Sequence, residues 1–245
     1  MSVQFHLRVE RQPEPRLGSA ILLYGNHSKD SFATVHQVSI DASGKATLLA
    51  GKPLSLGASR RLLTRLLPSA GGGDYLPESV LMVRGDELIW YEPPQMRHLG
   101  FKQSTQFPER SPGTLAGSAP TPGVIFHVSG AVWRIFAFTS AGRPTPDTAL
   151  FHAPTLNTYE DGTICAGTVR KPSGTTTECL QAWSDAFWKS NFLHANYDGV
   201  VKYRGTVTKF WRDAVAGRFP RGFPDRVLKP HGFTLGQYID ATRRK

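Results

Sequence analysis

The alternation of apolar and polar residues predicts several short strands in the first part of the chain. An apolar run covers residues 20–24, an alternating segment covers 32–40, and a third segment at 46–50 follows a turn at 42–44. The same pattern predicts four further strands, at 80–84, 88–91, 124–128 and 132–138. The last two are expected to pair as a hairpin around Ser129-Gly130.

A helical period predicts four helices: 56–67, a helix that starts near Thr175, 207–216 and 235–241. Ser55 is placed to cap the first of them, and the Thr175-x-x-Glu178 pattern is typical of a capping box at the start of the second. Strands followed by helices favour an α+β fold over the regular βαβ alternation of a parallel sheet.

Two stretches show no regular period. Residues 108–123 are rich in Pro, Gly and Ser and are predicted to be a linker, while 141–174 are predicted to form an extended, ordered loop. The expected organisation is a β-rich amino-terminal region with one helix at 1–115, a central region at 120–200, and a basic helical region at 201–245 packed on it.

Composition points to a globular chain, since 40% of its 245 residues are hydrophobic and 20% are charged. The longest uncharged stretch, 111–133, is interrupted by three prolines and is not expected to span a membrane. The first residues carry no signal for secretion, and two cysteines are too few for a disulfide scaffold, so we expect a cytoplasmic protein.

The formal net charge of +10 is concentrated at the carboxy-terminal end, where residues 166–245 hold 14 Lys and Arg against 6 Asp and Glu. Such a region could meet nucleic acid or an acidic protein. The candidate basic surface consists of Lys202, Arg204, Lys209 and Arg212.

Several common site patterns are absent from the sequence. There is no P-loop and no Gly-x-Ser-x-Gly, and none of the eight histidines pairs with another His or with a Cys at the spacing of zinc ligands. No cofactor and no metal site are therefore expected.

The segment 151–167 carries the most chemistry. Cys165 ends a polar turn formed by Asp161-Gly162, so its thiol is expected to be accessible and nucleophilic. Asn157 lies across the turn, where its side-chain amide could stabilise an oxyanion or could shape the turn itself. Cys179, by contrast, is expected to be a small buried group in a helix.

Two histidines are secondary candidates for the same site. His152 is expected to hold the loop rather than act as a base, and His194 could approach Cys165 from beyond the helix or have a purely structural role. No nearby residue is positioned by the sequence as an obvious base for Cys165. This favours acyl carriage over peptide hydrolysis, since even an unactivated cysteine is partly thiolate at neutral pH.

The spacing Asn157-x-x-x-x-Gly162-x-Ile164-Cys165 resembles the active-site segment of ubiquitin-conjugating enzymes. More closely, the chain resembles the PRTRC system protein B family, which consists of bacterial proteins similar to those enzymes. The matching motifs are Arg143-Pro144-Thr145-Pro146-Asp147-Thr148, His152-Ala153-Pro154, Asn157, Asp161-Gly162, Cys165-Ala166-Gly167, and Trp183 with Phe187-Trp188-Lys189-Ser190 and Phe192-Leu193-His194.

The resemblance covers about residues 140–200 and implies a UBC-like fold, an antiparallel β-meander flanked by helices, with 120–200 as the catalytic region. It implies that Cys165 carries a ubiquitin-like protein as a thioester and passes it to an amine. It further implies a ThiF-type activating enzyme and a JAB-type peptidase as partners, on a plasmid or integrative element. The alternative is a non-catalytic accessory protein of such an element that binds nucleic acid or a partner through the basic region.

Overall fold

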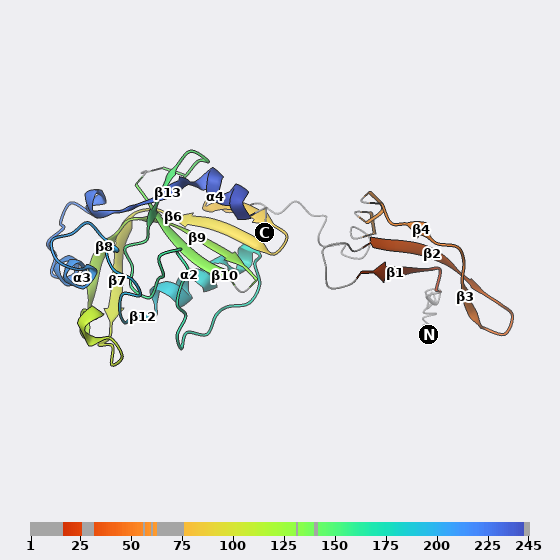
Figure 1. Cartoon of the computed structure of the whole chain (residues 1–245), viewed down its shortest axis with the longest axis horizontal. Coiled ribbons are helices and arrows are strands. Elements are labelled where there is room, and N and C mark those ends of the chain that lie inside the picture. The colour runs from red at the N-terminus through yellow and green to blue at the C-terminus, as the bar shows by residue number, and fades with distance from the viewer. Residues whose placement is uncertain are drawn as a thin grey trace, which may run out of the picture. The chain divides into compact units, whose positions relative to one another are not determined.

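The computed structural model describes residues 17–25, 32–55, 57–59, 61–62, 76–130, 132–139 and 142–242. The chain divides into two compact units, Met1–Asp74 and Tyr75–Lys245, each of which is described by itself. Figure 1 labels most of the helices and strands of both units.

The first unit contains a small antiparallel sheet in which the central strand β2 pairs with three others. Its strands are β1 (Ser19–Tyr24), β2 (Phe32–Ile40), β3 (Ala46–Leu48) and β4 (Lys52–Pro53). The pattern of alternation predicted the first three. None of the described residues in this unit is buried, so its sheet has no core of its own in the part of the chain that the structure describes.

The helix predicted at 56–67 is visible only at residues 57–59 and 61–62, and the rest of it lies outside the described residues. Its start is as expected, because the Ala58 N–H donates to the Ser55 hydroxyl at 3.2 Å.

The second unit is built on a six-stranded antiparallel sheet in the order β13-β11-β10-β9-β6-β5. The strands are β5 (Val80–Arg84), β6 (Glu87–Glu92), β9 (Gly123–Ser129), β10 (Val132–Phe138), β11 (Ala149–His152) and β13 (Pro230–Thr234). The predicted hairpin of β9 and β10 is confirmed, in register from Ser129 opposite Val132 to Gly123 opposite Phe138. The loop predicted at 141–174 is wrong at β11, which pairs with both β10 and β13.

A second, three-stranded sheet has the order β12-β7-β8, with β7 (Gln95–Phe101), β8 (Leu115–Thr121) and the two-residue β12 (Asn191–Phe192). The linker predicted at 108–123 is therefore wrong, because 115–121 pair along their whole length with β7. Its small residues have a packing reason: a Cβ on Gly117 would lie 2.7 Å from the Val215 side chain, so only glycine lets the helix that carries Val215 come this close.

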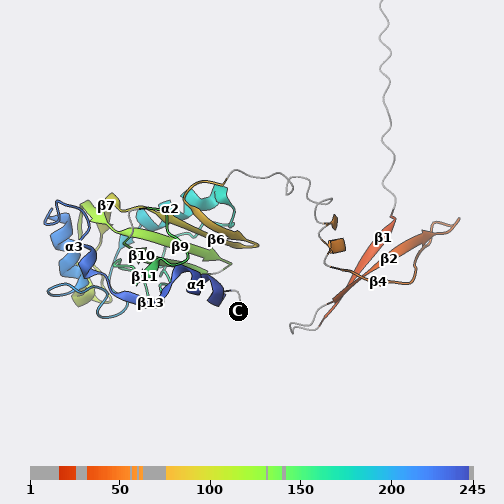
Figure 2. The same ribbon diagram turned by 90° about the horizontal axis from the view of Figure 1, so that it is seen from above.

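Helices cover both faces of the larger sheet, as Figure 2 shows for α2 (Leu180–Trp188) and α4 (Leu235–Thr242). Alternate residues of the same strands face the two cores. Trp90 and Phe126 pack toward α2 and α3 (Val207–Val215), while Ile89 and Ile125 pack toward α4. The fold is α+β with mostly antiparallel sheets, as predicted.

The third predicted helix begins at residue 207 as expected, but the second begins later than predicted. The capping box at Thr175 is wrong: a 3₁₀ turn at Thr177–Cys179 precedes α2, and the Thr176 hydroxyl contacts the Cys179 sulfur at 3.4 Å instead of capping the backbone. Helix α3 begins with a true cap, in which the Thr206 hydroxyl accepts from the Lys209 N–H. No helix in the described part of the chain has the length and apolar character needed to cross a membrane.

Candidate functional site

Cys165 closes a tight hairpin that runs back to Asn157. The Cys165 N–H donates to the Asn157 carbonyl at 2.7 Å, and the Tyr159 N–H donates to the Thr163 carbonyl at 2.8 Å. Between these bonds Thr158 pairs with Ile164, and both of these side chains are buried. Because side chains alternate along paired strands, Asn157, Tyr159 and Cys165 share the opposite, outward face.

The turn of this hairpin requires Asp161-Gly162. Gly162 has φ +83°, and a Cβ there would lie 2.8 Å from the Phe136 ring and 3.0 Å from the Ile135 carbonyl oxygen. The Asp161 carboxylate accepts from the Thr163 N–H at 2.9 Å and from the Thr163 hydroxyl at 2.8 Å. Burial opposes ionisation of Asp161, but these bonds and Arg134 outweigh it and lower its pKa. Asp161 and Gly162 therefore shape the turn.

Replacement of Gly162 by alanine is expected to destabilise the protein by about 1–3 kcal/mol, because the added Cβ meets both strain and a packed ring. Urea unfolding would measure this loss. Gly167 is the matched control, since it also has positive φ (+52°) but nothing within 4 Å of the added Cβ. Gly167→Ala should cost only the backbone strain, and an equal loss in both variants would contradict the packing argument.

Asn157 is held in the left-handed region, with φ 59°, and is the one described non-glycine residue with positive φ. Its side chain ties the hairpin to β12: Nδ2 donates to the Asn191 carbonyl at 3.0 Å, and Oδ1 accepts from the Leu193 N–H at 2.9 Å. Its backbone N–H donates to the His194 carbonyl at 3.0 Å. These bonds show that Asn157 shapes the loop. Only one of the two hydrogens on Nδ2 is used, in the bond to Asn191, so the second can still be donated.

Cys165, Asn157 and His194 line one pocket of about 530 Å³, which is within the range of ligand sites. Cys165 is partly buried and its thiol is not in a disulfide. The His194 ring packs on Phe107 at 4.9 Å, and its Nδ1 is buried without a hydrogen-bond partner among the described residues. The structure thus brings together three of the predicted site residues from two separate segments.

His152 lies elsewhere. Its ring is 4.6 Å from that of His231 and 6.0 Å from that of Tyr197, and it does not line the pocket of Cys165. Burial, with a contribution from nearby Lys229, lowers the pKa of His152, which favours a neutral imidazole. The loop that follows His152 is anchored at Pro154, whose carbonyl accepts from the Nε1–H of the buried Trp211 at 2.7 Å.

Sequence reasoning missed Tyr159. Its interaction with the Cys165 side chain raises the pKa of the Tyr159 hydroxyl, in keeping with their position on the same face of the hairpin. The signal was present in the hairpin register, because Tyr159 lies two residues from Asn157 and so falls on the same face as Cys165. A phenol in this place can donate a hydrogen bond to the sulfur when it leaves as a thiolate.

Tyr159→Phe is expected to slow acyl transfer from Cys165 roughly fivefold, the effect of one solvent-exposed hydrogen bond to a charged sulfur. Single-turnover discharge of the loaded protein would measure it. The fold should be unaffected, because the side chain is 47% exposed. Unchanged discharge rates would show that the hydroxyl has no part in the reaction.

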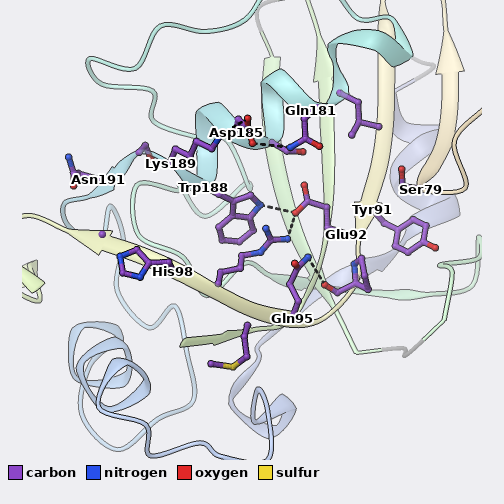
Figure 3. Close-up of a pocket in the computed structure, with 17 residues that line it drawn as sticks. Ser79, Tyr91, Glu92, Gln95, His98, Gln181, Asp185, Trp188, Lys189 and Asn191 are labelled. Carbon is purple, nitrogen blue, oxygen red and sulfur yellow. Dashed lines mark hydrogen bonds and ion pairs between the residues drawn. The ribbon is translucent and has the colours of Figure 1, made fainter. Parts of the chain in front are cut away.

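A larger groove, of about 830 Å³, lies beside β7 and α2 and is drawn in Figure 3. It does not contain Cys165, but it shares Lys189, Ser190 and Asn191 with the Cys165 pocket. Its floor is a closed network: Glu92 accepts from the Trp188 Nε1–H at 2.8 Å and pairs with Arg97, whose guanidinium lies 4.1 Å from the Trp188 ring. This arrangement serves the packing of α2 on the sheet.

The four residues of the predicted basic surface differ in the contacts that they make. Lys209 pairs with the buried Asp213 at 2.8 Å, and the Arg212 Nε–H donates to the Pro112 carbonyl at 2.7 Å. Lys202 and Arg204 are exposed. Among the described residues, no group of three or more His, Cys, Asp or Glu is arranged to hold a metal ion.

Comparison with known proteins gives one family. The model of prokaryotic E2 family D matches residues 67–231, which include the hairpin, Cys165 and the pocket residues named above. No curated protein and no solved structure matches the chain. The match extends over about two thirds of the 245 residues, and the chain therefore belongs to prokaryotic E2 family D.

Proposed function

We propose that the protein is a conjugating-enzyme-like transferase that accepts a small ubiquitin-like protein as a thioester on Cys165 and passes it to an amine. Membership of an E2 family supports the reaction class. The observation that carries the choice of residue is that Cys165 and Asn157 line the same pocket of about 530 Å³.

The reaction begins when the Cys165 thiolate attacks the carboxy-terminal thioester that joins the ubiquitin-like protein to its activating enzyme. The new C–S bond forms as the old one breaks, and the activating enzyme leaves as a thiolate. The free hydrogen of the Asn157 amide stabilises the oxyanion in this step and in the later attack by an amine. Tyr159 donates to the sulfur when the amine displaces it.

The family also guides the choice of partners. We infer a ThiF-type activating enzyme, and a JAB-type peptidase in the same pathway, as in the PRTRC systems that the segment 140–200 resembles. In this assignment 120–200 form the catalytic, UBC-like region and 201–245 pack on it. Contacts between the two parts support this: the Trp211 Nε1–H donates to the Pro154 carbonyl, and the His152 N–H donates to the Lys229 carbonyl at 2.9 Å.

The test is incubation of the chain with the activating enzyme, the ubiquitin-like protein and ATP, followed by gel electrophoresis without reductant. A band larger by the mass of the ubiquitin-like protein is expected early in the reaction, and at this stage it should vanish when dithiothreitol is added. A chain that stays unmodified, with an activating enzyme that is itself loaded, would contradict the proposal.

A further inference from the structure

We propose that Cys165 passes its acyl group to Lys102 of the same chain, so that the protein attaches the ubiquitin-like protein to itself. The inference rests on the thioester of the proposed function. It begins from the pocket, in which Cys165 and Lys102 are lining residues from different parts of the fold. No Asp or Glu is among the residues that line this pocket.

The backbone of Lys102 is fixed at the pocket. Its N–H donates to the Phe192 carbonyl at 3.1 Å, and its own carbonyl accepts from the Ser111 hydroxyl at 3.3 Å. The side chain is exposed, and no ion pair is recorded for its ammonium within the described residues. Lys102 thus has a backbone that is held by hydrogen bonds and a side-chain amine that is exposed.

A short series of hydrogen bonds links this origin to Cys165. The Cys165 N–H bonds to the Asn157 carbonyl, and the Asn157 side chain bonds to Asn191 and Leu193, on either side of the Phe192 whose carbonyl holds Lys102. Lys102 and the Asn157 that holds Cys165 are therefore both bonded to the same three consecutive residues, 191–193. Such fixed proximity favours an intramolecular transfer over one to a free amine.

Lys189 also lines the pocket, but it is less suited to the reaction. Its ammonium pairs with Asp185, four residues earlier in the chain, at 2.7 Å, so this nitrogen is already engaged by a carboxylate. Figure 3 labels both residues along the larger groove, which Lys189 also lines. Lys102 has no such recorded carboxylate partner among the described residues.

The transfer from Cys165 to Lys102 needs no reagent beyond the thioester and the lysine. The Lys102 ammonium first loses a proton to solvent, and the neutral amine then attacks the thioester carbonyl. An N–C bond forms, the C–S bond breaks, and the sulfur leaves as a thiolate that takes up the second proton lost by the nitrogen. The product is an isopeptide that leaves a bulky protein at the mouth of the pocket. The modified chain cannot be loaded again, so self-conjugation ends its activity as a carrier.

The experiment loads the full chain without any added acceptor and follows two products. The reducible adduct is measured first, and the product that resists reductant is expressed as a fraction of it. We expect a resistant product whose rate of formation per chain does not change with protein concentration, and whose peptide map gives Lys102. Resistance to hydroxylamine distinguishes an isopeptide from an ester on a pocket serine or threonine.

Three variants separate the outcomes. Lys102→Arg should reduce the resistant fraction at least tenfold, whereas Lys45→Arg, an exposed residue that does not line the pocket, should leave it unchanged. Loss in Lys189→Arg with retention in Lys102→Arg would overturn the proposal, as would a stable thioester that yields no resistant product; in both cases the carrier function stands. If no reducible adduct forms, the carrier function and this inference fail together.

Discussion

Replacement of Cys165 by alanine is expected to abolish the reducible adduct entirely, because no other thiol lines the pocket beside Asn157. Cys165→Ser should likewise give no adduct that dithiothreitol removes, since an oxygen ester is not cleaved by thiol exchange. The measurement is the fraction of chain loaded after incubation with the activating enzyme, the ubiquitin-like protein and ATP, read without and with reductant.

Cys179 provides the matched control within the same molecule. It is also a free, partly buried thiol, but it lies at the start of α2, where its sulfur contacts the Thr176 hydroxyl at 3.4 Å. Cys179→Ala should load as the wild type does. Full loading of Cys165→Ala would show that Cys165 does not carry the acyl group. Loss of loading in Cys179→Ala alone would show the same.

Replacement of Asn157 by alanine is expected to slow loading by about 100-fold or more, the usual cost of removing one oxyanion donor. Alanine also loses the two bonds to Asn191 and Leu193 and disfavours the positive φ of this residue. The rate of thioester formation under single-turnover conditions would measure the combined effect.

Two further variants separate these causes. Asn157→Gly keeps access to positive φ but lacks the amide, and Asn157→Asp keeps an oxygen for the Leu193 N–H but lacks the donor. If the amide stabilises the oxyanion, both variants stay slow even where the fold is intact by circular dichroism. Recovery of the wild-type rate in either variant would assign Asn157 to shaping the loop alone.

Much of the larger sheet could be predicted because its strands carry strong local patterns. Strands β9 and β10 are runs of large apolar residues around a Ser129-Gly130 turn, and helix α3 has a clear amphipathic period. The pairing of β7 with β8 could not be predicted in this way. The sequence of β8, with Gly117 and Pro120, reads as a loop, and it becomes a strand through its distant partner and through contact with α3.

The site was predictable to a similar extent. Asn157, Gly162 and Cys165 were found because they share one hairpin, in which spacing along the chain determines position in space. His194 and Lys102 reach the pocket only through the tertiary fold, and no local pattern could place them there. His152 shows the opposite case, since it is near Cys165 in sequence but packs on His231.

The central claim is that Cys165 carries the acyl group, and intact-mass spectrometry of the loaded chain tests it most directly. The account predicts a mass gain equal to the ubiquitin-like protein less one water, which is lost on reduction and maps to the peptide that contains Cys165. A reducible gain that maps to any residue other than Cys165, or no gain beside a loaded activating enzyme, would contradict it.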